Sequence, residues 1–188
     1  MGLFSIEHAK AVYRTDIAFY NLAVVGLAGW LALGSPHAPR LLLASCVLAG
    51  LVVWTLIEYG LHRFVLHGLR PFSIWHGEHH RRPFALICTP TVMSAGLIAG
   101  LVFLPAWWLS DLWLGSAFTL GVLIGYLAYT VTHHATHHWR ADSAWLRQRK
   151  RWHALHHHAD KQRACYGVTT SFWDHVFGST RRTLQAPA

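Results

Sequence analysis

The sequence predicts an all-α integral membrane protein, with four transmembrane helices and a cytoplasmic helical cap that carries a histidine-rich dinuclear metal site. Hydrophobic residues make up 53% of the 188 residues and charged residues only 13%, which is too apolar for an ordinary soluble domain. The apolar residues are concentrated in four long stretches. Thirteen of the sixteen histidines lie beside these stretches in a few short clusters.

The first apolar stretch is IAFYNLAVVGLAGWLAL, and three more follow it. Each is near the roughly 17 to 25 residues that a helix needs to cross a bilayer core. The first stretch has one strongly polar residue, Asn21, and the second has only Ser45 and Thr55, so neither shows the polar face of a soluble surface helix. We therefore expect a single membrane domain over residues 1–188, in preference to a soluble bundle. Its expected spans are residues 17–33, 41–60, 92–109 and 112–132.

Basic residues predict the orientation, because loops that stay in the cytoplasm carry an excess of Lys and Arg. Lys10 and Arg14 precede the first span, most other basic residues lie after the second or fourth span, and only Arg40 falls on the opposite side. Both termini and the histidine-rich segments 61–90 and 133–180 are therefore expected in the cytoplasm. Richness in Ala, Leu, Gly and Arg favours a bacterial inner membrane.

The net charge of +8 is explained by this topology and by attraction to anionic lipid headgroups, so nucleic acid is not an expected partner. A cleavable signal peptide is not expected either, because residues 1–16 lack an apolar core. The first span should therefore remain in the mature protein.

The histidine clusters have the spacing of metal ligands on helices. WHGEHH and RWHALHHH both contain H-x-x-H-H, in which positions i, i+3 and i+4 share one helix face and present three rings toward a common point. His133 and His137 form a similar pair four residues apart. The spacing alone allows His134 with His138 equally well.

His62 and His67 are five residues apart, so they diverge on a regular helix and need a helix end or a loop to converge. Imidazole suits iron, zinc, copper and nickel, and ten imidazoles would give two metal ions about five ligands each. Two carboxylates near the clusters, Glu58 and Glu78, are expected to contact an imidazole N–H and not the metal itself.

The four boxes HRFVLH, HGEHH, HHATH and HALHH resemble the histidine motifs of the fatty acid hydroxylase and sterol desaturase superfamily. The stretch YGVTTSFWDHVFGS is similar to the segment that follows the last box in fatty acid 2-hydroxylases and sterol desaturases, so the resemblance covers the chain from Glu58 onward. In this stretch Asp174 is expected to fix the cap by hydrogen bonding.

The resemblance implies a four-helix transmembrane bundle under a cytoplasmic cap that holds two non-haem iron ions, which activate dioxygen against an acyl or sterol C–H bond. Zinc can replace iron on purification. The ligands that the resemblance implies are His62, His67, His76, His79, His80, His133, His137, His153, His156 and His157.

These features predict dioxygen-dependent hydroxylation of an unactivated C–H bond of a lipid, such as a fatty acyl chain. A sterol or acyl desaturase is an alternative, because the same oxidant can remove a second hydrogen. A carotenoid ring hydroxylase is another, although the tail argues against it. A membrane metal transporter is the non-enzyme alternative, but transport sites lie near the bilayer midplane, and these spans contain no histidine before Thr132.

An electron donor is also implied. The sequence contains nothing that resembles the cytochrome b5 domain fused to many eukaryotic fatty acid 2-hydroxylases, so we expect a separate donor of the ferredoxin, rubredoxin or cytochrome b5 type. The basic cluster Arg147, Arg149, Lys150 and Arg151 would suit an acidic carrier. The same charges also fit the orientation signal.

Overall fold

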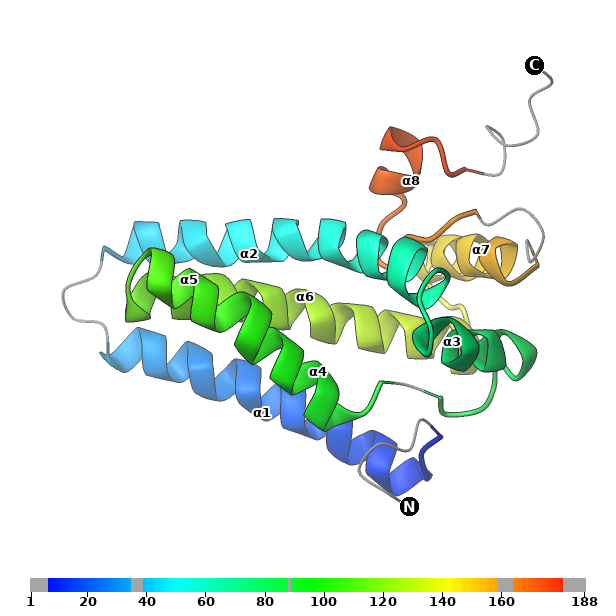
Figure 1. Cartoon of the computed structure of the whole chain (residues 1–188), viewed down its shortest axis with the longest axis horizontal. Helices are drawn as coiled ribbons and strands as arrows, with labels where there is room; N and C mark the ends of the chain where they lie inside the picture. Colours follow the sequence, from blue (N-terminus) through cyan, green and yellow to red (C-terminus); the bar gives the residue numbers. More distant parts are fainter. Residues whose placement is uncertain (1–6, 35–38, 88, 159–163, 181–188) are drawn as a thin grey trace. The chain divides into compact units, whose positions relative to one another are not determined.

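A computed structural model describes residues 7–34, 39–87, 89–158 and 164–180, which form mainly helices (Figure 1). Residue 88 and residues 159–163 of the two expected cytoplasmic segments lie outside the described residues. The helices are α1 (Lys10–Gly34), α2 (Arg40–Gly60), η1 (Leu61–Leu66), α3 (Phe72–Arg81), α4 (Thr91–Ile98), η2 (Ala99–Phe103), α5 (Leu104–Leu109), α6 (Leu112–His138), α7 (Ala144–His158) and α8 (Phe172–Val176).

The described chain contains four helical regions that are long and apolar enough to cross a membrane, and they confirm the predicted all-α membrane fold, whereas the cytoplasmic position of its cap stays a prediction. They are Lys10–Gly34, Arg40–Leu66, Thr91–Leu109 and Leu112–His138. Three of these regions extend beyond the expected spans, because α1 begins at Lys10, the second region continues through η1 to Leu66, and α6 continues through its histidines. The orientation of these helices in a membrane stays a prediction.

The described residues fall into two compact units. The first contains the residues up to Trp54 and those from Leu86 to Leu127, and the second contains Thr55–Ala85 and the residues from Ala128 onward. Helices α2 and α6 contribute residues to both units. All the histidines that the sequence implies as ligands belong to the second unit.

Helices α1, α2 and α6 pack together in the first unit around Leu31, Leu43, Ala117 and Leu120. The backbones of α2 and α6 approach closely there, since a Cβ added at Gly121 would meet the carbonyl oxygen of Val47. Small residues at such crossings let membrane helices pack by van der Waals contact.

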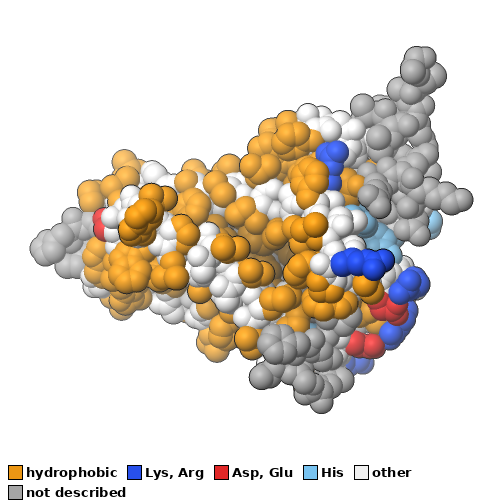
Figure 2. All heavy atoms as spheres, in the orientation of Figure 1, with side chains coloured by type: hydrophobic (Ala, Val, Ile, Leu, Met, Phe, Trp, Pro, Cys, Tyr) orange, Lys and Arg blue, Asp and Glu red, His pale blue; other side chains and the backbone are white. Residues whose placement is uncertain are grey.

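Large apolar side chains remain exposed on the outer faces of these helices, as expected for surfaces that face lipid. Leu33 is 90% exposed and Trp108 is 85% exposed. Figure 2 shows hydrophobic side chains over much of the visible face of the span helices. Such a surface would be an aggregation site in water but suits a bilayer.

Polar contacts also join α1 and α4 in the first unit. The Tyr20 hydroxyl lies 2.6 Å from the Ser94 hydroxyl, and the Thr91 hydroxyl donates to the Asp16 carboxylate at 2.5 Å. Tyr20, Asp16 and Ser94 are all buried. These buried polar groups therefore satisfy one another.

Candidate metal centre

The His62 and His67 side chains are brought together by η1, which is a π-helical turn. Hydrogen bonds in a π-helix join residues five apart, so residues at this spacing come to lie close to one face. The two ring centroids are 5.3 Å apart, and His67 is the C-terminal cap of the turn. The sequence required a helix end or a loop here, and the structure provides a π-helical turn that ends at His67.

Nine of the histidines form two groups in which the candidate ligand nitrogens lie within 4.8 Å of one another. This spread is close to the separation of about 4 Å expected for ligands on opposite sides of one ion. The five-histidine group contains His62, His67, His76, His80 and His156, and the four-histidine group contains His79, His133, His137 and His153.

His157, the tenth implied ligand, lies beside both groups. Its Nε2 is 3.0 Å from Nε2 of His153, which belongs to the four-histidine group. Its ring stacks on His80, a member of the five-histidine group, with centroids 4.3 Å apart. The structure therefore brings together all ten residues that the sequence resemblance implied.

Helices α3 and α7 each supply both groups. On α3, His76 and His80 join the five-histidine group, whereas His79 joins the four-histidine group. On α7, His156 and His153 are divided in the same way. The three rings of one H-x-x-H-H box therefore do not converge on a single point, as the spacing had suggested, but serve two neighbouring points.

The structure separates the two registers that the spacing of HHATHH left open. His133 and His137 belong to the four-histidine group. His134 and His138 instead stack on each other, with ring centroids 4.4 Å apart. Phe84 lies near His138 at a centroid distance of 6.2 Å. Only the first pair is placed to bind a metal with the other histidines.

The hydrogen bonds of the rings show how the groups fit a cation. Nδ1 of His62 donates to the carbonyl oxygen of Tyr166 at 2.5 Å, and Nδ1 of His156 donates to that of Ala164 at 2.8 Å. Because each neutral ring carries one N–H, the Nε2 atoms of these two histidines present lone pairs. They face Nε2 of His76 and of His67, each at 3.0 Å. Lone pairs that converge in this way fit a shared metal ion.

Five candidate ligands outside the span helices are held in the neutral form, namely His76, His79, His153, His156 and His157. Burial, followed by the charges of neighbouring histidines, lowers the pKa of His79 from 6.5 to about 3 and that of His157 to about 2. Burial also lowers the pKa values of His76, His153 and His156 well below 6.5. Neutral imidazole is the form that ligates metals, so these rings are ready to bind at neutral pH.

The carbonyl groups that accept hydrogen bonds from His62 and His156 belong to the 164–169 segment. Glu58 anchors this segment. The Glu58 carboxylate accepts hydrogen bonds from the backbone N–H groups of Val168 at 2.8 Å and Thr169 at 2.9 Å, and from the Thr169 hydroxyl at 2.6 Å. We expected Glu58 to contact an imidazole N–H. These bonds place its carboxylate on the backbone segment that supplies acceptors to the imidazoles.

Asp174 anchors the same segment from α8. Its side chain is fully buried and accepts hydrogen bonds from the backbone N–H groups of Tyr166 and Gly167, each at 2.8 Å. It also accepts one from the Ser179 hydroxyl at 2.8 Å and one from Trp152 Nε1 at 3.2 Å. These are contacts of the kind that the sequence predicted for Asp174.

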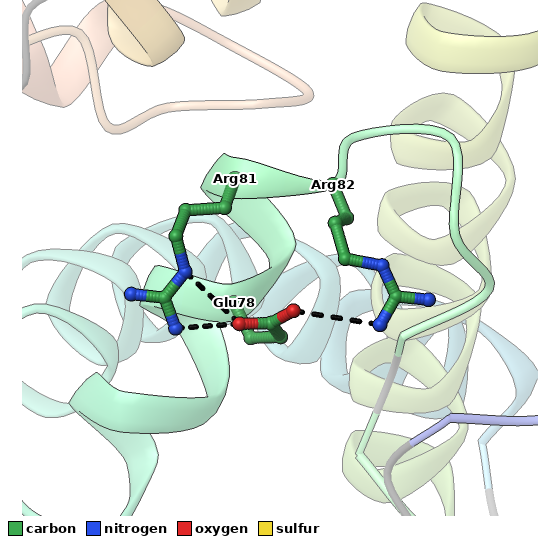
Figure 3. A network of polar contacts seen from close by, with 3 residues as sticks. All are labelled: Glu78, Arg81 and Arg82. Atoms are coloured by element: carbon green, nitrogen blue, oxygen red, sulfur yellow. Dashed lines mark hydrogen bonds and ion pairs between the residues drawn. The ribbon is translucent and has the colours of Figure 1, made fainter.

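Glu78 pairs with two arginines, Arg81 and Arg82 (Figure 3). Its carboxylate lies 2.5 Å from Arg81 and 3.4 Å from Arg82, and these arginines lower the pKa of Glu78, chiefly through the hydrogen bond from Arg81. The expected contact with an imidazole is not what the described residues show. The reason is helical spacing. Glu78 shares a helix face with Arg81 and Arg82 at positions i+3 and i+4, whereas His76 and His80 lie two residues before and after it and point elsewhere.

The sequence also misplaced Arg149. It was grouped with Arg147, Lys150 and Arg151 in a basic surface, but its side chain is only 4% exposed. Arg147 and Arg151 are exposed. The carbonyl acceptors of the 164–169 segment were missed as well, because a backbone group carries no signal in the sequence.

The structure has helices long and apolar enough to span a membrane and two neighbouring groups of imidazoles that could bind metal. These features define an integral membrane protein with a histidine-rich candidate metal site. Within this class, the chain belongs to the fatty acid hydroxylase family, whose model matches residues 47–179.

Named relatives agree with this membership. The ceramide very long chain fatty acid hydroxylase scs7 of Schizosaccharomyces pombe is 34% identical, over 69% of this chain and 40% of the relative. The dihydroceramide fatty acyl 2-hydroxylase FAH2 of Arabidopsis thaliana is 35% identical, over 69% of this chain and 58% of the relative. The matched region is thus less than two thirds of the length of either relative.

A solved structure also resembles this chain. It is described as full-length scs7p with only the hydroxylase domain visible, and it superposes with a TM-score of 0.81 at 27% sequence identity. The superposition covers 97% of this chain and 70% of the other chain. This likeness supports the same helical fold.

Proposed function

We propose that this protein uses dioxygen to hydroxylate an unactivated C–H bond in the acyl chain of a membrane lipid, at a centre of two iron ions. The observation that carries the proposal is the pair of neighbouring imidazole groups in a chain of the fatty acid hydroxylase family. The proposed ligands are the members of the two groups together with His157. Imidazole nitrogen is a donor that suits iron.

The names of the relatives support the substrate class. Those from Schizosaccharomyces pombe and Arabidopsis thaliana are named as hydroxylases of ceramide or dihydroceramide fatty acyl chains. An acyl chain attached to a lipid is therefore the substrate that we propose here. The exposed apolar faces of the span helices agree with a protein that meets such a substrate within the bilayer.

When bound, the two iron ions would supply the oxidising power that breaks the C–H bond and inserts one oxygen atom of dioxygen. The side chains and backbone of the protein have three tasks at such a centre. The neutral imidazoles bind the ions, the carbonyl groups of Tyr166 and Ala164 fix the orientation of two rings, and burial excludes water from the histidines.

We also propose the cellular arrangement. The excess of basic residues near the histidine segments favours a cytoplasmic position for the centre and for both termini, in a bacterial inner membrane. Electrons would come from a separate ferredoxin, rubredoxin or cytochrome b5. The exposed residues Arg147 and Arg151 suit an acidic donor.

Untargeted mass spectrometry of host membrane lipids tests this proposal. Membranes with the wild-type protein should contain a lipid that has gained one oxygen atom, and membranes with His156→Ala should not. His158→Ala is the matched control, because His158 is exposed on the same helix and lies outside both groups. This control should behave as wild type. A lipid that has lost two hydrogens would show a desaturase instead, and a His156→Ala variant with full activity would reject the metal assignment.

A further inference from the structure

Arg149 is a buried cation that the proposed metal centre does not use directly. It lies on the face of α7 that also carries Trp152, His153 and His156, at positions i, i+3, i+4 and i+7. Its side chain is 4% exposed, and its Nε and Nη1 atoms make no hydrogen bond within the described part of the chain. Buried donors without acceptors destabilise a fold, so this arginine calls for a reason other than packing.

Two buried carboxylates supply that reason. Glu58 is 3% exposed and Asp174 is 0% exposed, and both act electrostatically on Arg149. The hydrogen bond from Trp152 Nε1 to Asp174 places the Arg149 face of α7 beside Asp174. Burial lowers the pKa of Arg149 and the two carboxylates oppose this effect, so the guanidinium keeps its charge.

Without the arginine, two buried negative charges would share one short backbone segment. Both carboxylates accept hydrogen bonds from N–H groups of the 164–169 segment. Removal of one member of a buried charged set leaves the remaining charges uncompensated, which is strongly destabilising. The charge of Arg149 therefore adds to the hydrogen bonds that hold Glu58 and Asp174 on the segment, because it offsets their two negative charges.

The segment in turn determines how two rings of the five-histidine group point. The carbonyl groups of Tyr166 and Ala164 accept the Nδ1–H groups of His62 and His156. Among the described residues, the hydrogen bonds from this segment to histidine rings go to His62 and His156, and both belong to the five-histidine group. A disturbance of the segment should therefore affect one group much more than the other.

We infer that Arg149 is a positioning residue for the five-histidine group. Its charge holds Glu58 and Asp174 against the 164–169 segment, and this segment orients His62 and His156 for ligation. The inference rests on the proposed metal centre but does not depend on the reaction that the centre performs.

Zinc retention tests the inference without any activity measurement. The purified protein is loaded with zinc and challenged with a chelator, and the loss of each ion is followed over time. In Arg149→Met, one ion should leave at least about tenfold faster than in wild type, and the other ion should leave at the wild-type rate. A change of about tenfold is the usual scale when a group that supports a metal ligand is removed. Arg149→Lys should restore slow loss, because it keeps the charge. Arg147→Met is the matched control on the exposed face of α7 and should match wild type.

Two further backgrounds identify the labile ion. His137→Ala disables the four-histidine group, and there Arg149→Met should speed the loss of the remaining ion. His67→Ala disables the five-histidine group, and there Arg149→Met should have no effect. Circular dichroism and gel filtration check that each variant is folded. If Arg149→Met does not fold, Arg149→Lys and Arg149→Gln are compared in the same way.

Three results would overturn the inference: wild-type retention of both ions in Arg149→Met, equal acceleration of both ions, or equal lability of the lysine variant and the variant without the charge. A wild-type protein that binds two ions but oxidises no lipid would reject the proposed function and leave this inference standing. Oxidised lipid together with unaltered zinc retention in the Arg149 variants would support the proposed function and reject this inference.

Discussion

Substitution of Asp174 by Asn is the sharpest test of how the centre is held. The side chain is fully buried, and its two oxygens accept four hydrogen bonds, two at each oxygen. Asn has nearly the same shape but only one acceptor oxygen. Its NH2 group would therefore face a backbone N–H of Tyr166 or Gly167 at a position where both groups are donors.

The size of the effect follows from these contacts. A buried donor that loses its acceptor destabilises the folded state by about 1 to 3 kcal/mol, and bonds to a charged acceptor lie at the upper end. Asn leaves up to two donors without an acceptor, so the free energy of unfolding should fall by about 4 kcal/mol. For a chain of this length, such a change lowers Tm by roughly 10 °C.

The assay is thermal unfolding in detergent, followed by circular dichroism, with metal content measured in parallel. Asp142→Asn is the matched control, because Asp142 is exposed, and its Tm should not change. Asp174→Asn should also retain metal less well, since the 164–169 segment would no longer hold His62 and His156. A Tm for Asp174→Asn within about 2 °C of wild type would refute the reasoning, because it would place the loss below 1 kcal/mol.

Three further predictions follow from other features of the structure. The metal-free protein should lose stability as the pH falls from 6.5 toward 3, because histidines of the unfolded chain take up protons in this range whereas the buried His79, with its pKa of about 3, does not. Each such histidine should lower the free energy of unfolding by about 1.4 kcal/mol per pH unit. A Tm that stays constant from pH 7 to pH 5 would contradict this prediction. Gly121→Ala should reduce the free energy of unfolding by about 1 to 3 kcal/mol, because its Cβ would meet the Val47 carbonyl oxygen. Gly26→Ala is the control, because the added Cβ would lie in open space, and it should be neutral in the same unfolding assay. Glu78→Gln should leave metal content unchanged, because Glu78 pairs with Arg81 and Arg82. A lower metal content by elemental analysis would instead support a contact between Glu78 and an imidazole.

Local features of the sequence were enough to predict the fold class. An apolar stretch of sufficient length indicates a span by its own composition, and all four candidate spans were recognised in this way. The shared face of His76, His79 and His80 is likewise a property of one helix. Such features depend on neighbours three or four residues away, and these are visible in the sequence.

Other features depend on residues that are far apart in the chain. The sequence could not show that Glu58 binds Thr169, or that Arg149 is buried among charges and not displayed on a surface. It could not show that the neighbouring candidate ligands His79 and His80 belong to different groups. The His79 ring lies beside His133 of α6, whereas the His80 ring lies beside His67 at the end of η1, and only packing determines which residues lie opposite each ring.

Composition and residue spacing were sufficient to predict a helical membrane protein with enough imidazoles at its helix ends for two metal ions. The division of those imidazoles into two groups, the π-helical turn between His62 and His67, and the backbone carbonyl groups that orient the rings became visible only in the folded chain. Composition and helical periodicity act over a few residues. The orientation of a buried ring, in contrast, is set by hydrogen bonds and charges that the fold brings from about one hundred residues away, as in the bond between His62 and Tyr166.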